Sequence, residues 1–407
     1  MIKKTRININ TSKKIYFKVL LSFIFNQGKE YKKIFLQKLK DFLHTDNLLV
    51  TSQGRVAAYN IFKVIISDKK NEILISPYTL TEVVNAILYA GGKPIYVEIN
   101  LKTGLPLEVD LDKKINEKTA GLVLTHLFSN KKNILEFNKR YQKKLVIIED
   151  VAINFGAKID QKKFLGTIFD YGFYSFGVMK NLCTFHGGAI FSRDKDMLNL
   201  IEENLKKNID YPIILSLKLF FFCILIDVMY SKYIYNYFTH YILKLSLKNL
   251  DRLMYPGVYP KLPSIIPKHY YYKFQKNFAI AGIENLKVLN QKIDQRIKNV
   301  KLYEKYLIDD LKLNIYDFYN INSFLEYPIL LNKNKNKFLS EKLLAIGYDV
   351  RHTWYVNSAR FIKMDSKFNN LVISDKLHES VLSLPTHNRI NETDIINICE
   401  LINYYEK

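Results

Sequence analysis

Short apolar runs of strand length alternate with helical segments across the first half of the chain. The apolar runs cover residues 48–50, 73–76, 94–99, 121–126 and 145–149. The intervals between several of them carry apolar residues at helical spacing, as over residues 133–141. Because strand and helix alternate, the pattern predicts an α/β fold in which a mainly parallel sheet lies between layers of helices.

Polar residues stand where several of these predicted strands end. Asp150 follows the run 145–149, His126 ends the run 121–126, and a turn over residues 52–55 precedes a predicted helix over 56–66. Parallel sheets bind ligands at the carboxyl ends of their strands, and the start of a helix offers free N–H groups to a phosphate. The pattern therefore predicts one ligand site at this edge, although a helix cap and a core histidine are the structural alternatives for Asp150 and His126.

Lys180 lies in a turn rich in serine and glycine. Ser175 and Gly177 precede it, and Gly187 and Gly188 follow it. A buried strand that ends in an acid, followed by a lysine in such a turn, is typical of enzymes that use pyridoxal 5′-phosphate (PLP). The lysine amine bonds covalently to the cofactor aldehyde, and the acid pairs with the protonated pyridine nitrogen. A solvated loop lysine is the alternative interpretation of Lys180.

Several short motifs occur in a characteristic order. They are Glu149-Asp150, Gly156-Ala157, Ser175-Phe176, Lys180-Asn181 and Gly187-Gly188-Ala189, with further matches over residues 76–79, 85–99, 124–128 and 382–387. In this order they resemble the DegT/DnrJ/EryC/StrS family, the fold-type-I PLP aminotransferases of nucleotide-linked keto-sugars. The resemblance covers residues 48–200 well and 275–405 loosely.

The resemblance implies a fold-type-I PLP-transferase with a seven-stranded-type sheet, and an aminotransferase for surface glycan or glycoconjugate biosynthesis. The implied partners are a nucleotide-sugar substrate, an amino-acid donor and a second copy of the chain. The implied catalytic residues are Lys180 and Asp150, and both also bind the cofactor. The other expected cofactor-binding residues are Ser175, Gly54, Arg55, Tyr78 and His126. A lysine at position 180 argues against the dehydratase branch of the family, where histidine replaces it.

The chain also departs from the family pattern. Ile153 stands in place of a glutamine, Leu80 in place of an aromatic residue, and Arg55 in place of a small hydroxyl residue. Arg55 therefore holds a phosphate or forms an ion pair. His186 replaces a glutamate and either aids proton transfer or packs in the turn. These departures keep an alternative open, in which a divergent member has another PLP reaction or a non-catalytic, membrane-associated role.

Further contacts to the substrate are expected from the second half of the chain. The candidates are His352, Trp354 and His387. Ordinary packing is the alternative for each of them.

The net charge of +22 attracts anionic partners, but it does not indicate nucleic-acid binding. Lysine is spread along the whole chain, and no zinc spacing, RNP-like strand or basic heptad accompanies it. No metal site is expected either. Three distant cysteines form no disulfide framework, and no cleavage site follows the apolar patch over 19–25. We expect a cytoplasmic protein, with peripheral membrane contact left open.

The sequence suggests three parts. They are an N-terminal helical arm over residues 1–45, a large PLP-binding domain over 46–265 and a smaller α/β domain over 266–407. One long helix is expected over 279–307. The segment 211–250 is unusually apolar, but Lys218 and Asp227 flank only eight uncharged residues, which are too few to span a bilayer. We predict that it is buried in the fold or in a subunit interface, and a helix lying on a membrane surface is the alternative.

Overall fold

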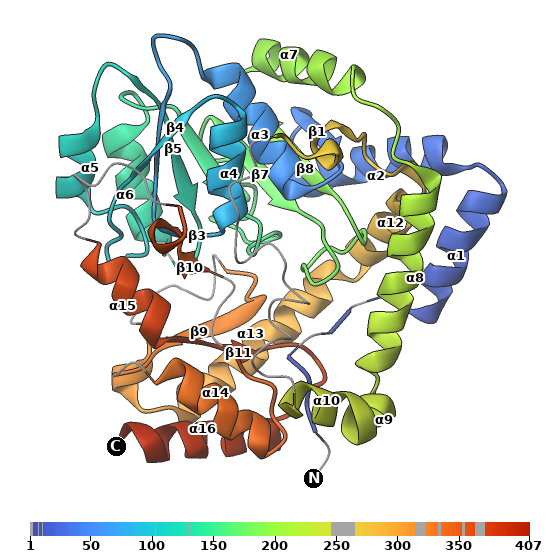
Figure 1. Cartoon of the computed structure of the whole chain (residues 1–407), viewed down its shortest axis with the longest axis vertical. Helices are drawn as coiled ribbons and strands as arrows, with labels where there is room; N and C mark the ends of the chain where they lie inside the picture. Colours follow the sequence, from blue (N-terminus) through green and yellow to red (C-terminus); the bar gives the residue numbers. More distant parts are fainter. Residues whose placement is uncertain are drawn as a thin grey trace.

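A seven-stranded sheet forms the centre of the computed structural model (Figure 1). The structure describes residues 3–6, 8–9, 11–101, 103–128, 130–245, 265–313, 322–332, 335–351, 355–362 and 371–407. In the order β1-β8-β7-β6-β5-β2-β4, the strands are β1 (Leu48–Thr51), β8 (Gly188–Ser192), β7 (Tyr171–Ser175), β6 (Ile147–Asp150), β5 (Thr119–Thr125), β2 (Glu72–Ile75) and β4 (Lys93–Tyr96). Strand β8 runs antiparallel to β7 and β1, while the pairs from β7 to β4 are parallel. The predicted α/β fold with a mainly parallel sheet is confirmed.

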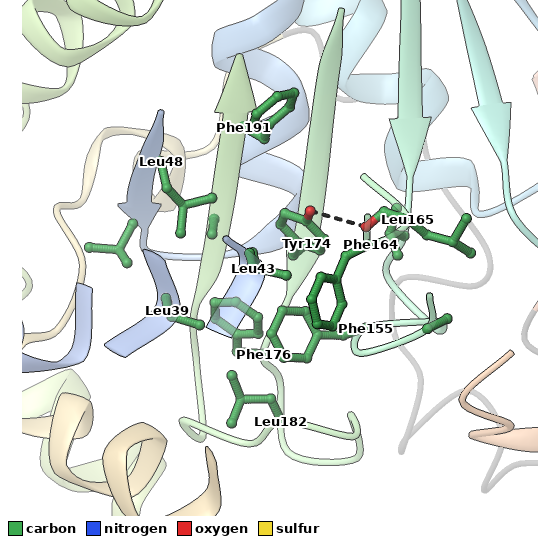
Figure 2. Packing of buried hydrophobic residues seen from close by; sticks show 14 of the residues in the cluster. Leu39, Leu43, Leu48, Phe155, Phe164, Leu165, Tyr174, Phe176, Leu182 and Phe191 are labelled. Atoms are coloured by element: carbon green, nitrogen blue, oxygen red, sulfur yellow. Dashed lines mark hydrogen bonds between the residues drawn. The ribbon is translucent and has the colours of Figure 1, made fainter. Parts of the chain in front are cut away.

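Helices cover both faces of this sheet because successive strand residues point to opposite sides. In β2, Leu74 joins one apolar cluster, whereas Ile73 and Ile75 join the other. The first cluster contains residues of α2 (Gly28–Leu43), α5 (Glu108–Lys114), α6 (Lys131–Tyr141) and α12 (Ala279–Lys287). The second contains residues of α3 (Gly54–Ile65), α4 (Thr81–Tyr89) and α7 (Lys195–Lys206). Figure 2 shows the first cluster, where Phe155, Tyr174 and Phe176 pack edge to face.

The N-terminal region forms two helices, α1 (Lys13–Ile24) and α2, as the sequence predicts. Helix α2 packs on α12, and Phe35 of α2 is fully buried. Gly282 of α12 makes this contact close, because a Cβ atom at that position would overlap the Phe35 ring. The first helices are therefore part of the packed core.

A second core lies below the sheet in Figure 1. It is built on α13 (Leu289–Tyr306), on the antiparallel pair β9 (Glu326–Leu330) and β11 (Val381–Pro385), and on α14 (Asn336–Ala345), α15 (Val372–Ser380) and α16 (Glu392–Glu406). The expected single helix over 279–307 is wrong, because Val288 leaves helical geometry at ψ 6° and separates α12 from α13. The three-part division of the chain stays a prediction.

The apolar segment forms α8 (Ile213–Met229), α9 (Lys232–Ile234), a π-helical turn (Tyr235–Thr239) and α10 (His240–Leu245). The prediction that this segment is buried within the fold is wrong for its outer side. Phe221 and Phe222 are 57% and 54% exposed, because only one side of α8 packs on the protein. The end of the predicted segment, 246–250, lies outside the described residues. Among the described helices none is individually long and apolar enough to span a membrane, although α8 and the bent stretch Lys232–Leu245 pass that test as a pair.

We predict that Gly282→Ala will loosen the contact between α2 and α12. The added methyl group would press into the buried Phe35 ring, so the free energy of unfolding should fall by ~1–3 kcal/mol. Chemical denaturation would measure this change. Gly177→Ala is the matched control, because its Cβ would meet only Ser175 Oγ at 4.0 Å. Equal stability of the two variants would contradict the close packing of α2.

Candidate functional site

A cavity of about 460 Å³ opens at the carboxyl ends of β6 and β7. Its wall comes from the strand ends, the turn after β7, the first turns of α3 and α4, and two residues from the second half of the chain. The lining residues are Gln53, Gly54, Arg55, Leu80, Glu82, Val83, Asp150, Ala152, Ile153, Phe173, Ser175, Gly177, Val178, Met179, Lys180, His186, Gly187, Leu325 and Tyr355. Five predicted site residues therefore lie around one cavity, namely Gly54, Arg55, Asp150, Ser175 and Lys180.

Asp150 ends β6 and is only 2% exposed. Its Oδ1 atom accepts a hydrogen bond from the Ala152 N–H at 3.0 Å. Burial raises the pKa of Asp150 to about 6, and the nearby charges of Lys180 and His126 oppose that rise. A buried carboxylate of this kind is stabilised by a cationic group placed beside it.

Lys180 lies in a tight turn after β7, in which its own N–H donates to the Gly177 carbonyl at 3.0 Å. Burial lowers the pKa of Lys180, while Asp150, Glu326 and Glu82 act in the opposite direction. A lowered pKa increases the share of neutral amine, which is the nucleophilic form. The site thus contains an acid and an amine whose pKa values both move toward neutrality.

The start of α3 forms a cradle at the same cavity. Gly54 is required by space, because a Cβ atom there would lie 2.8 Å from Ser175 Cβ. A Cβ at Gly188 would likewise lie 2.6 Å from the Gln53 carbonyl carbon. The Ser52 hydroxyl and the Gln53 side-chain oxygen are buried without a hydrogen-bond partner among the described residues. Free backbone N–H groups, a helix dipole and unpartnered polar atoms at one place fit a phosphate group.

Arg55 and His186 also line the cavity, beside this cradle. The Arg55 guanidinium forms an ion pair with Glu82 of α4 at 2.6 Å. His186 Nδ1 lies 3.0 Å from the Tyr211 hydroxyl. Burial, and then the charge of Arg55, lower the pKa of His186 to about 3. A neutral imidazole with such a pKa is poorly matched to proton transfer near pH 7.

Tyr78 and His126 are not among the described residues that line this cavity. His126 Nε2 lies 2.9 Å from the Glu149 carboxylate, behind the strand ends. Tyr78 lines a smaller neighbouring cavity of about 40 Å³, and its ring lies 6.2 Å from that of Tyr355. Their predicted contacts to a cofactor stay predictions.

Tyr355, Leu325 and Glu82 are cavity residues that the sequence reading missed. Tyr355 reaches the site because β10 (Val356–Asn357) pairs with β3 (Tyr78–Thr79), a contact between distant parts of the chain. No short sequence motif predicts such a pairing. His387 lies elsewhere, with Nε2 2.8 Å from the Thr5 carbonyl, and His352 and Trp354 lie outside the described residues.

Comparison with known proteins agrees with this geometry. GDP-perosamine synthase of Escherichia coli O157:H7 is 29% identical over 179 residues, which is 43% of this chain and about half, 48%, of that protein. The solved structure of Helicobacter pylori PseC, an aminotransferase involved in the biosynthesis of pseudoaminic acid, superposes with a TM-score of 0.73 at 18% identity over 99% of both chains.

A second solved structure has the same fold. It is the E. coli GDP-4-keto-6-deoxy-D-mannose-3-dehydratase with bound hydrated PLP, with a TM-score of 0.72 at 16% identity over 99% of this chain and 100% of that one. The fold is therefore that of PLP-dependent sugar-modifying enzymes. Residues 10–207 and 267–403 match the profile of one family, so the chain belongs to the DegT/DnrJ/EryC1/StrS aminotransferase family.

Proposed function

We propose that this protein is a PLP-dependent aminotransferase that transfers an amine from an amino acid to a nucleotide-linked keto-sugar. The observation that carries the proposal is the meeting of Lys180, Asp150 and the α3 cradle around one cavity of about 460 Å³. An amine, a buried acid and a phosphate cradle are the three contacts that PLP needs from a protein.

The residues present fit PLP by charge and by space. Lys180 would hold its aldehyde carbon, Asp150 its pyridine nitrogen, and the N–H groups at the start of α3 with Ser175 its phosphate. When bound, PLP supplies an electron-accepting ring that stabilises negative charge on the substrate carbon. The buried Asp150 carboxylate would favour a positive charge on the pyridine nitrogen, because a nearby cation stabilises a carboxylate that burial has desolvated.

Lys180 has two roles in this proposal. It anchors the cofactor before the substrate arrives, and its released amine then moves a proton at the reacting carbon of the substrate. Its lowered pKa suits the second role, because a neutral amine can accept a proton near pH 7. Leu80, Ile153 and Tyr355 give the cavity a largely apolar wall around that amine.

The substrate class follows from the relatives and from charge. The E. coli relative is named for a GDP-linked amino sugar, and the H. pylori enzyme for the biosynthesis of pseudoaminic acid. A net charge of +22 favours the approach of an anionic nucleotide sugar. A lysine at position 180 supports amine transfer over dehydration. An amino-acid donor, a homodimer and a cytoplasmic location complete the proposal.

The first test concerns Lys180. Borohydride reduction of the PLP-loaded protein, followed by digestion and mass spectrometry, should place the cofactor mass on the peptide that contains Lys180. Lys180→Ala should lose this adduct and the visible absorbance band, whereas Lys162→Ala, at an exposed bend, should keep both. An adduct on another lysine, or no adduct in excess PLP, would show that the protein is not a PLP enzyme of this type.

The second test concerns Asp150 and turnover. Asp150→Asn removes a negative charge from a sheltered site, so turnover of a nucleotide keto-sugar should fall by at least ~100-fold. Release of the keto acid from the amino-acid donor would measure it. Asp160→Asn, in an exposed turn, should leave turnover unchanged. If Asp150→Asn kept the turnover of the wild type, a role for Asp150 in the reaction would be contradicted.

The third test uses pH and needs no substrate. The pKa of Asp150 is about 6 in the folded protein, against an ordinary value of 3.8. Between these two pH values the folded state holds a proton that the unfolded state has released. The contribution of Asp150 to the free energy of unfolding is therefore most favourable below pH 3.8 and is lost as the pH rises to about 6. Between pH 4.5 and 7 the cofactor-free wild type should lose ~2 kcal/mol relative to Asp150→Asn. Denaturant titrations would measure the free energy of unfolding at each pH. An equal change for the two proteins between pH 4.5 and 7 would contradict the raised pKa.

A further inference from the structure

The apolar segment from α8 to α10 lies outside the part of the chain that the family shares. The family match ends at residue 207 and resumes at residue 267, and the helices from Ile213 to Leu245 fall in this gap. In Figure 1 α8 runs beside α1 on one side of the molecule, and α9 and α10 lie at the lower end of α8. The family profile therefore leaves this segment unmatched, and its role calls for an explanation of its own.

One side of α8 anchors the segment to the protein. Phe220 packs against Tyr16 and Phe185, with ring centroids 6.0 Å away in each case. Cys223, about one turn later, is fully buried on the same side. This contact fixes which side of the helix faces outward.

The outward side carries large apolar side chains from the first turn of α8 to beyond the bend. Ile214, Phe221, Phe222 and Leu225 of α8 are each more than half exposed, and so are Tyr237 and Phe238 beyond the bend. Contiguous exposed apolar residues of this kind mark a surface that contacts another protein or a membrane. The partner must accept both large apolar side chains and the charges among them.

Those charges are positive. The one acidic residue between Ile213 and Leu245 is Asp227, and it lies 3.8 Å from the Arg389 guanidinium. Lys218, Lys232 and Lys244 are exposed. Lys218 lies in the same helical stripe as Ile214 and Phe221, where its stem can cover apolar surface while its amine reaches outward. Lysine is depleted in protein–protein interfaces, whereas it is typical of helices that bind anionic lipid.

The bend also suits a flat surface. The stretch Lys232–Leu245 leaves the axis of α8 at 61°, so neither helix continues the other as a spanning rod. Tyr233, Tyr237 and Tyr241 follow one another at four-residue spacing and are exposed. Tyrosine has an apolar ring and a polar tip, which is the combination found at the headgroup level of a bilayer.

We propose that α8, α9 and α10 form a docking surface for an anionic lipid bilayer. The outer side lies among the headgroups, with Phe221, Phe222 and Phe238 at the acyl boundary and the lysines at the phosphates. This inference is independent of the proposed transamination. It commits to a lipid surface, although a second copy of the chain could also cover an apolar side.

Vesicle sedimentation with the full chain tests the proposal. The protein should bind vesicles of phosphatidylcholine and phosphatidylglycerol more tightly than pure phosphatidylcholine vesicles, and high salt should weaken the difference. Phe221→Ser with Phe222→Ser should reduce binding at least ~10-fold, because two apolar side chains no longer leave water. Lys218→Glu with Lys232→Glu should lower the preference for anionic vesicles by at least ~5-fold for each lysine removed. Leu200→Ser, on the exposed side of α7, is the control and should bind like the wild type.

Three results would overturn the proposal. Equal binding to neutral and anionic vesicles, or none to either, would remove the lipid surface as partner. Vesicle-independent dimers that dissociate in the double phenylalanine variant would show that a second copy covers this side. Extraction from cell membranes by detergent but not by carbonate would show insertion across the bilayer. The lysine variant keeps the apolar side intact, so it decides the matter even if the phenylalanine variant fails to fold.

Discussion

The site depends on one buried carboxylate that does not line the cavity. Glu149 Oε1 accepts a hydrogen bond from the Gly166 N–H at 2.8 Å, and its other oxygen accepts from Ile168 and Phe169 at 2.8 and 3.0 Å. His126 Nε2 completes the set at 2.9 Å, so the carboxylate ties β5, β6 and the loop before β7 together. Because side chains alternate along a strand, Glu149 and Asp150 point to opposite faces. The structural acid thereby fixes the place of the next residue in the chain.

The cost of burying the second acid is linked to ligand binding. Asp150 and Lys180 have their pKa values moved in opposite directions by the same burial, and each partly opposes the shift of the other. A pair of this kind is poorly satisfied without a ligand, because low polarity penalises both charges. A ligand that brings a cation to Asp150 and consumes the amine of Lys180 relieves both penalties together. The same two shifts that destabilise the empty fold therefore favour a PLP-like ligand.

Short sequence motifs predict the parts of the candidate site that lie within single turns and strand ends. Strand ends and glycine-rich turns are short-range features, so the sequence could predict that Asp150, Ser175 and Lys180 lie together, and all three line one cavity. Tyr355 could not be predicted in this way, because it reaches the cavity through the pairing of β10 with β3. For the segment 211–250, the expected burial within the fold is wrong for the outer side of α8, while burial in a subunit interface stays a prediction. Hydrophobicity shows that an apolar helix needs a covered side, but it does not say what covers that side. The described part of this chain leaves the outer side of α8 exposed.

Three residues that depart from the family pattern lie close together in the structure. Arg55, Leu80 and Ile153 all line the same cavity, and Arg55 meets Glu82 at 2.6 Å. This ion pair leaves no net charge beside the cradle, so Arg55 adds little free positive potential for a phosphate while it remains paired. The attraction for a phosphate then rests on the N–H groups at the start of α3 and on Ser175. If a bound phosphate drew Arg55 away, Glu82 would be left near Lys180 and would favour its protonated form, as the charge of Glu82 already does. The phosphate end and the amine end of the cavity are therefore electrostatically coupled through Glu82, a residue that no sequence motif singles out.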